Sequence, residues 1–231
     1  MMAGSEARRN GPTTMILPKK TADLAPGTRV VRYAESEIPT PRGPMTTIVY
    51  REVADGVPDP NKEHVALVVG DALASGGEVL ARIHSECLTS EVFGSLKCDC
   101  REQLDSALER CFAEGGGVVL YLRQEGRGIG LGNKIRAYAL QARGADTVQA
   151  NHQLGFETDL RTYDIAAGMF EDLGIDRVAL MTNNPDKLRQ LESHGIRVTR
   201  RVPAIARPNI HSEKYLHTKR DKCGHMIDID D

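Results

Sequence analysis

From residue 78 onward the sequence alternates between short apolar runs and segments with helical spacing. The runs EVLARIH, GVVLYLR and RVALMTN, which begin at residues 78, 117 and 177, are continuous apolar stretches of the kind that buried strands show. Apolar residues at helical intervals, closed by glycines, mark four helices, at residues 100–116, 131–144, 162–174 and 186–195. Strands that alternate with helices predict a layered α/β core.

The N-terminal third has a different pattern. Residues 28–40, 43–53 and 64–71 are rich in β-branched residues and are separated by Pro, Gly and Asp, which predicts strands. The segment VPDPNKE, residues 57–63, contains prolines and charges and is predicted to be a loop. The expected fold is therefore α/β, with a mixed sheet in which antiparallel N-terminal strands precede the alternating strand and helix units.

Length and composition indicate one domain behind a short tail. The chain has 231 residues, of which 40% are hydrophobic, and this is enough for one sizeable core. Residues 1–28 lack the apolar run of a signal peptide and are expected to form a flexible tail, with a single domain over residues 29–231. No stretch approaches the roughly 18 apolar residues of a membrane span, so we expect a cytoplasmic protein with reduced thiols and no membrane partner.

The net charge gives no indication of a nucleic-acid or membrane partner, so any anion binding must be local. Lys and Arg together number 30, against 32 Asp and Glu, while aromatic residues make up only 4% of the chain and Trp is absent. Without aromatic residues to stack on bases, a few arginines near the C-terminus do not indicate nucleic-acid binding. We interpret these arginines as a solvated strand face or a subunit contact: Arg197, Arg200, Arg201 and Arg207.

Three of the five cysteines lie in one segment, SECLTSEVFGSLKCDC, residues 85–100. Cys87, Cys98 and Cys100 could form a disulfide with one thiol left over, hold a metal ion or fill the core. A reducing compartment disfavours the disulfide, and three thiolates suit zinc. His84 could close a structural four-ligand site; without it, the open position would take water, as in catalytic zinc sites. The two other cysteines are interpreted as a core residue and a surface thiol: Cys111 and Cys223.

Two predicted strand-to-helix turns carry cations and could bind phosphate. RQEGRGIGLGNK, residues 123–134, places glycines before a helix, where backbone N–H groups attract anions, although a plain flexible turn is the alternative. TNNPDK, residues 182–187, adds Lys187 to a turn that could equally be an ordinary helix cap. In TDLRTYD, Asp159 and Arg161 would share one face of an extended chain, and a surface ion pair is the simplest interpretation.

Together these segments resemble GTP cyclohydrolase II. The likeness rests on RIHSECLTSEVFGSLKCDC, QEGRGIGLGNKIRAYALQ, NHQLGF followed by DLRTYD, and TNNPDK, and it extends from about Arg29 to the C-terminus. It implies zinc-dependent opening of the imidazole ring of GTP at C8, with release of formate and pyrophosphate. The product would be 2,5-diamino-6-(5-phosphoribosylamino)pyrimidin-4(3H)-one, formed in the first step of riboflavin biosynthesis. The resemblance also implies Mg²⁺ with the triphosphate and a homodimer, and we expect a monofunctional enzyme.

The resemblance further assigns roles to residues. Cys87, Cys98 and Cys100 match zinc ligands, and Tyr138 matches a tyrosine beside the guanine ring and the zinc. Asp159 matches a proton acceptor and Arg161 a proposed nucleophile; because a guanidinium group is a very poor nucleophile, a phosphate clamp is an equally good interpretation of Arg161. The positions that match GTP-binding residues are Arg82, Ile83, His84, Ser85, Glu86, Gln103, Glu125, Gly126, Arg127, Thr147, Thr182 and Lys187.

Two other functions remain open from the sequence. The first is an enzyme that opens the ring but keeps the formyl group, for a specialised pathway, and the presence of Tyr138 argues mildly against it. The second is a zinc-stabilised GTP-binding regulator without turnover. Such a regulator would have no need of Asp159, Arg161 and Tyr138, so their presence counts against it.

Overall fold

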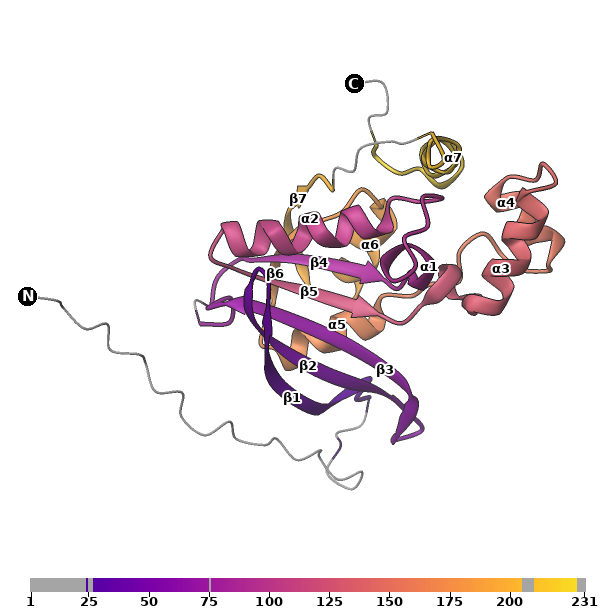
Figure 1. The fold of residues 1–231 in the computed structure, drawn as a ribbon. Coiled ribbons are helices and arrows are strands. Elements are labelled where there is room, and N and C mark those ends of the chain that lie inside the picture. The colour runs from indigo at the N-terminus through magenta and orange to yellow at the C-terminus, as the bar shows by residue number, and fades with distance from the viewer. Residues whose placement is uncertain (1–23, 25–26, 75, 205–209, 228–231) are drawn as a thin grey trace, which may run out of the picture.

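A seven-stranded sheet forms the centre of the structure (Figure 1). The structure is a computed structural model that describes residues 24, 27–74, 76–204 and 210–227, so the predicted tail lies almost entirely outside the described residues. The strands are β1 (Val30–Thr40), β2 (Gly43–Ala54), β3 (Val57–Gly70), β4 (Val79–Ser85), β5 (Gly116–Leu122), β6 (Arg177–Met181) and β7 (Arg197–Val202). Their order in the sheet is β1-β2-β3-β5-β4-β6-β7.

Strand direction divides the sheet into two parts. Strands β1, β2 and β3 pair antiparallel, and β3 is also antiparallel to β5. Strands β5, β4, β6 and β7 run parallel to one another. The prediction of a mixed sheet with an antiparallel N-terminal part is therefore confirmed.

Four of the helices overlap the predicted helical segments: α2 (Cys100–Ala113), α3 (Gly130–Gln141), α5 (Asp164–Asp172) and α6 (Pro185–Ser193). The sequence did not predict the others, which are α1 (Leu88–Glu91), the 3-10 turn η2 (Glu125–Gly128), α4 (Thr147–Gln153) and α7 (Glu213–Cys223). In the described part of the chain, no helix is both long enough and apolar enough to cross a membrane.

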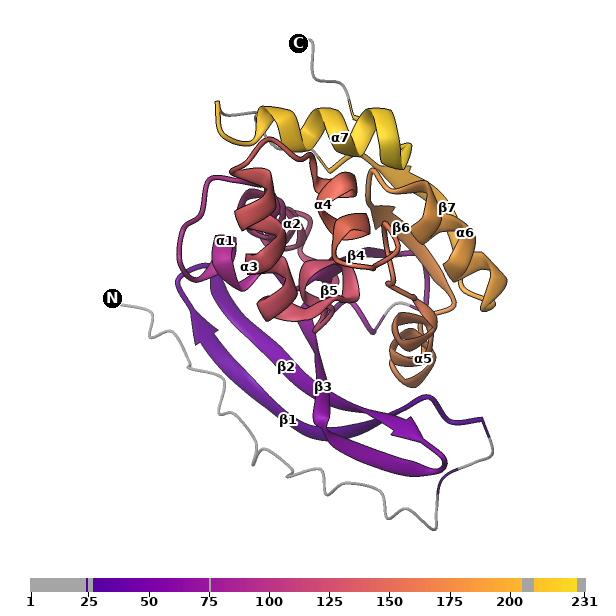
Figure 2. The ribbon, with the colours of Figure 1, turned by 90° about the vertical axis from the view of Figure 1, so that its right-hand side faces the viewer.

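Helices cover both faces of the parallel part of the sheet. Successive residues of a strand point to opposite faces, so Leu80 packs with α2 while Ala81 packs with α5 and α6. On β5, Val119 likewise packs on the α2 side of the sheet and Val118 on the side of α5 and α6. Figures 1 and 2 show α2 across one face, with α5 and α6 against the other. Burial on both faces explains why these strands are continuous apolar runs in the sequence.

Gly117 lets α2 lie close to β5. A Cβ atom at this position would be 2.5 Å from the Sγ of Cys111, closer than real Cβ contacts come. Cys111 itself is fully buried in the core between α2 and the sheet. The prediction that Cys111 is a core residue is confirmed.

The prediction of a loop over residues 57–63 was wrong. These residues belong to β3, which pairs with the end of β2 across a turn at Asp55 and Gly56. Both turn residues have positive φ, 50° and 76°, as the type I′ turn of an Asp-Gly hairpin requires. The register then shifts between Arg51 and Val53 of β2, so Pro60 interrupts no regular ladder.

The carboxyl ends of β4, β5 and β6 meet at one edge of the sheet because these strands are parallel. From β4 the chain passes through α2 to β5 on one side, whereas β6 lies on the other side of β4. Such reversals of strand order create crevices in which α/β proteins bind ligands. In Figure 1 the arrowheads of β4 and β5 point toward α1 and α3, which lie at this edge.

Candidate active site and metal centre

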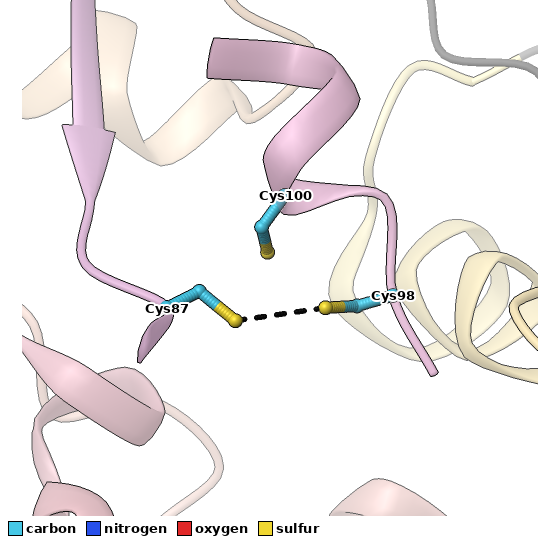
Figure 3. A group of neighbouring side chains, drawn as sticks. All are labelled: Cys87, Cys98 and Cys100. Carbon is cyan, nitrogen blue, oxygen red and sulfur yellow. Dashed lines mark hydrogen bonds between the residues drawn. The ribbon is translucent and has the colours of Figure 1, made fainter. Parts of the chain in front are cut away.

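The three cysteines of residues 85–100 come together at the end of β4. Cys87 follows the strand, Cys98 lies in the loop before α2, and Cys100 is the first residue of α2 (Figure 3). Their sulfur atoms all lie within 4.8 Å of one another, and those of Cys87 and Cys98 are 3.6 Å apart. All five cysteines of the chain are free thiols. Three converging sulfur donors are a set that zinc prefers, so these residues fit the metal that the resemblance implies.

His84 does not join the cysteine cluster. Its Nε2 lies 2.7 Å from Oε1 of Glu91, and its ring stacks on Tyr121 with 5.7 Å between centroids. In the part of the chain that the structure describes, the group of side chains able to hold a metal ion consists of the three cysteines. The arrangement in which His84 closes a four-ligand structural site is therefore not formed.

The buried imidazole of His84 makes stability depend on pH. Burial lowers the pKa of His84 from 6.5 to about 4, against the opposing effect of Glu91 and with smaller contributions from Arg82 and Lys187. As the pH falls from 6.5 to about 4, His84 takes up a proton in the unfolded chain but not in the folded protein. The free energy of unfolding therefore decreases over this pH range. We expect a loss of about 2 kcal/mol between pH 7 and pH 5 from this group. Urea unfolding at the two pH values measures it.

Two variants isolate the contribution of His84. The substitution His84→Gln keeps a hydrogen-bonding side chain near Glu91 and should flatten the pH dependence of stability. His152, which is exposed, provides the matched control, and His152→Gln should leave the pH dependence as it is. Equal pH dependence in wild type and His84→Gln would show that another group is responsible.

A cavity of about 320 Å³ opens beside the cysteines, within the size range of small-molecule sites. Its walls come from the end of β4, the η2 turn, α3, α4 and α7. Many of the predicted site residues line it: Ser85, Glu86, Cys87, Cys98, Cys100, Glu125, Gly126, Arg127, Tyr138, Thr147 and Arg161. The cavity thus brings together predicted residues that lie far apart in the sequence.

The other predicted site residues lie outside the cavity wall: Arg82, Ile83, His84, Gln103, Asp159, Thr182 and Lys187. Arg82 is buried, and its guanidinium group donates to Oε1 of Gln103 at 2.5 Å and to the carbonyl oxygen of Met181 at 3.0 Å. Lys187 is also buried, and its Nζ donates to the carbonyl oxygen of Ile83 at 2.7 Å. Behind the cavity, Arg82 therefore links β4 to β6, and Lys187 links α6 to β4.

A buried ion pair ties α7 to the cysteine segment. Asp99, which lies between Cys98 and Cys100, accepts hydrogen bonds from Gln103 and, at 2.7 Å, from Nζ of Lys219 on α7. Burial alone would raise the pKa of Asp99, but the positive charge of Lys219 lowers it, so the carboxylate stays ionised. The C-terminal helix is therefore part of the site's framework.

Asp159 holds Arg161 at the edge of the cavity. Nε and Nη2 of Arg161 donate to the two carboxylate oxygens at 2.9 and 2.5 Å, and Nη1 donates to Oγ of Ser85 at 3.3 Å. The ion pair expected from the sequence is present, with the Arg161 side chain 14% exposed and the Asp159 side chain 33% exposed. Burial works to raise the pKa of Asp159, but Arg161 lowers it below its usual value, which makes this carboxylate a weak base.

The η2 turn places Arg127 between the cavity and the C-terminal segment. Gly126 and Arg127 both have left-handed backbone conformations, with φ of 63° and 60°, which suits glycine but is uncommon for arginine. Nη1 of Arg127 donates to the carbonyl oxygen of Thr158 and to Sγ of Cys223, both at 3.4 Å. Cys223 is thus half-buried against Arg127, in contrast to the surface thiol that the sequence indicated.

The cavity also contains groups that the sequence did not single out. The ammonium groups of Lys97 and Lys134 lie 5.2 and 5.8 Å from the centroid of the Tyr138 ring. Tyr215 and Thr218 reach the cavity from α7. Both lysines lie in segments in which cysteines or glycines are the prominent residues, whereas the sequence of α7 is mostly polar and has no amphipathic pattern.

Comparisons with known proteins identify the family of this chain. The GTP cyclohydrolase II family model matches residues 31–203. GTP cyclohydrolase-2 of Azotobacter vinelandii (strain DJ / ATCC BAA-1303) is 54% identical over 198 residues, which are 86% of this chain and 92% of that protein. GTP cyclohydrolase-2 of Escherichia coli O9:H4 (strain HS) is 50% identical over 196 residues, 85% of this chain and 97% of that protein. The riboflavin biosynthesis protein RibBA of Bacillus subtilis (strain 168) is 50% identical over 200 residues, 87% and 49% of the two chains.

The family match and the site coincide in the sequence. Residues 31–203 include the three cysteines, the η2 turn, α3 and α4, whereas α7 lies beyond the match. Identity of about half extends over most of this chain and over nearly the full length of the two relatives named GTP cyclohydrolase-2. This chain belongs to the GTP cyclohydrolase II family and is an enzyme of that class.

Proposed function

We propose that this enzyme hydrolyses GTP at C8 of guanine and at the triphosphate. The products would be formate, pyrophosphate and 2,5-diamino-6-(5-phosphoribosylamino)pyrimidin-4(3H)-one, which makes this the first step of riboflavin biosynthesis. One observation carries the proposal: a single cavity is lined by the cysteine cluster, Tyr138 and two arginines. A metal site, a proton donor and cations for phosphate are the parts that this reaction needs.

Cys87, Cys98 and Cys100 would hold a zinc ion. When bound, zinc supplies the Lewis acidity that brings the pKa of water toward ~7, which suits attack on a weakly electrophilic aromatic carbon. Hydrogen bonds from Cys100 and Cys98, together with the charge of Lys134, lower the pKa of the Cys87 thiol. A thiolate is the form of cysteine that binds metals, so Cys87 is ready to bind an ion, whereas the pKa values of Cys98 and Cys100 are raised by their cysteine neighbours and by burial.

Tyr138 would supply a proton to the base. Burial raises the pKa of Tyr138, so the phenol keeps its proton at neutral pH. It could donate this proton to the ring nitrogen that separates from C8 when the imidazole opens. The ammonium group of Lys97 would stabilise the resulting phenolate. A second water then releases C8 as formate and leaves an amine on the pyrimidine.

Arg127 and Arg161 would bind the phosphates. Because Asp159 fixes Arg161 through both carboxylate oxygens, the guanidinium group is oriented before substrate arrives. Mg²⁺ would enter with the triphosphate. Burial first, and then the nearby charges of Arg82 and Arg161, lower the pKa of Lys187 well below its usual value. Arg127 and Arg161 line the cavity, and their positive charges attract a polyanion.

A homodimer is part of the proposal. Strand β7 lies at one edge of the sheet and carries Arg197, Arg200 and Arg201. Arg200 pairs with Glu78 at 3.1 Å, whereas Arg207 lies outside the described residues. A second copy could cover this edge. Sedimentation at working concentrations should give twice the mass of one chain, and a single-chain mass would contradict the dimer.

One incubation tests the reaction. Zinc-loaded protein is mixed with GTP and Mg²⁺, the pyrimidine is identified by mass spectrometry, and formate and pyrophosphate are assayed separately. We expect the diaminopyrimidine monophosphate with both by-products, and no turnover in a sample stripped of zinc. A formamido product without formate would indicate an enzyme that stops after ring opening, and bound but unchanged GTP would indicate a regulator.

A further inference from the structure

Lys134, on α3, has its ammonium group buried against the cysteine cluster. Its Nζ lies 3.0 Å from Sγ of Cys87 and 2.7 Å from Oε1 of Glu125. The ammonium group therefore donates to a carboxylate and to a sulfur at the same time.

Glu125 fixes this lysine in place. Its Oε1 also accepts the N–H of Gly126 at 2.8 Å, and its Oε2 accepts the N–H of Leu88 at 2.8 Å. Leu88 directly follows Cys87, so the contacts close a ring that runs from Cys87 through Leu88 and Glu125 to Lys134 and back to the sulfur. The ring restrains both the backbone and the side chain of one cysteine of the cluster.

The Lys134 contact would offset negative charge at the metal site. Three thiolates around a divalent ion leave an excess of one negative charge, and Glu125 adds another close by. An N–H donor to a thiolate disperses its charge, and partners behind the ligands of a metal site hold them in orientation. Tyr138 follows Lys134 by one helical turn, so the same stretch of α3 would support the metal and present the proton donor.

We propose that Lys134 is a positioning residue of the metal site: it donates to the Cys87 thiolate, disperses its charge and holds Cys87 toward the ion. This inference rests on the proposed function, because it requires zinc on the three cysteines. It goes further by assigning part of the metal affinity to a lysine behind the ligands.

Metal affinity provides the test. Zinc binding by the full chain is measured by competition with a chromophoric chelator, and the thiolate-to-cobalt absorption band is recorded after loading with Co²⁺. Lys134→Met should weaken zinc binding about 10- to 100-fold and shift the cobalt band. Arg136→Met is the matched control, because Arg136 is an exposed cation on the same helix that contacts Asn133, whereas Lys134 is the donor to Cys87. It should bind both metals as the wild type does.

A second pair of variants separates the contact with sulfur from the contact with Glu125. Lys134→Met leaves Glu125 buried without its cation, so Glu125→Gln is compared with Glu125→Gln/Lys134→Met. We expect the double variant to bind zinc more weakly than Glu125→Gln. Equal affinity within this pair, or wild-type affinity in Lys134→Met, would overturn the inference and leave the proposed function standing. A wild-type protein that binds neither zinc nor cobalt would overturn both.

Discussion

Replacing Cys98 by serine is expected to abolish ring opening while the protein stays folded. Cys98 is buried, and its sulfur converges with those of Cys87 and Cys100, so its loss leaves two thiolates for the ion. A metal that acts as a Lewis acid contributes several kcal/mol to such a reaction, which corresponds to a loss of at least ~1000-fold in formate release. Zinc content and formate are measured on the same preparation, and circular dichroism reports the fold.

A second cysteine serves as the control for this prediction. Cys111 is as deeply buried as Cys98 but lies in the core under α2, away from the metal group. Cys111→Ala should therefore retain zinc and turnover, with a modest loss of stability. If metal-free Cys98→Ser released formate at the wild-type rate, the catalytic role of the metal would be excluded.

The sequence predicted the fold wherever local pattern and burial agree. Strands β4 and β5 are covered on both faces, so their apolar runs identify them without any knowledge of their neighbours. The loop prediction for residues 57–63 was wrong because it gave more weight to their prolines and charges than to the Asp55-Gly56 turn before them. Helix α7 was missed because it is mostly polar and Leu216 is its one residue in the hydrophobic core.

In the candidate site, too, the sequence predicted the local groupings of residues but not the contacts between distant segments. Cysteines close together in the sequence identified the metal group, since a short loop can bring their sulfurs together. The pair of Asp99 and Lys219 joins residues 120 positions apart, and no periodic pattern relates them. The contact of Lys134 with Cys87 spans 47 positions and depends on how α3 packs against the end of β4. Such contacts follow from tertiary packing, and only the structure supplies them.

Replacing Arg161 by alanine is expected to remove pyrophosphate release. The guanidinium group is held by Asp159 and directed to Ser85 at the cavity wall, where it can meet charge that develops on the phosphates. Loss of one such oriented donor typically costs about 100- to 1000-fold in rate. Pyrophosphate release and formate release are followed in parallel. Arg189, exposed on α6 and paired with Asp186, gives the matched control, and Arg189→Ala should release pyrophosphate normally.

Variants of Arg161 can distinguish a phosphate clamp from a covalent carrier of a guanylyl group. Despite its burial, Asp159 and nearby tyrosines raise the pKa of Arg161, so the guanidinium keeps its proton and has no free electron pair for attack on phosphorus. A clamp needs only charge and position, so Arg161→Lys should recover part of the activity lost in Arg161→Ala. A carrier would leave a guanylyl group on Arg161 in the wild-type protein, detectable by mass spectrometry after rapid denaturation. We expect no such adduct, because the contacts that orient Arg161 also hold it in the charged form.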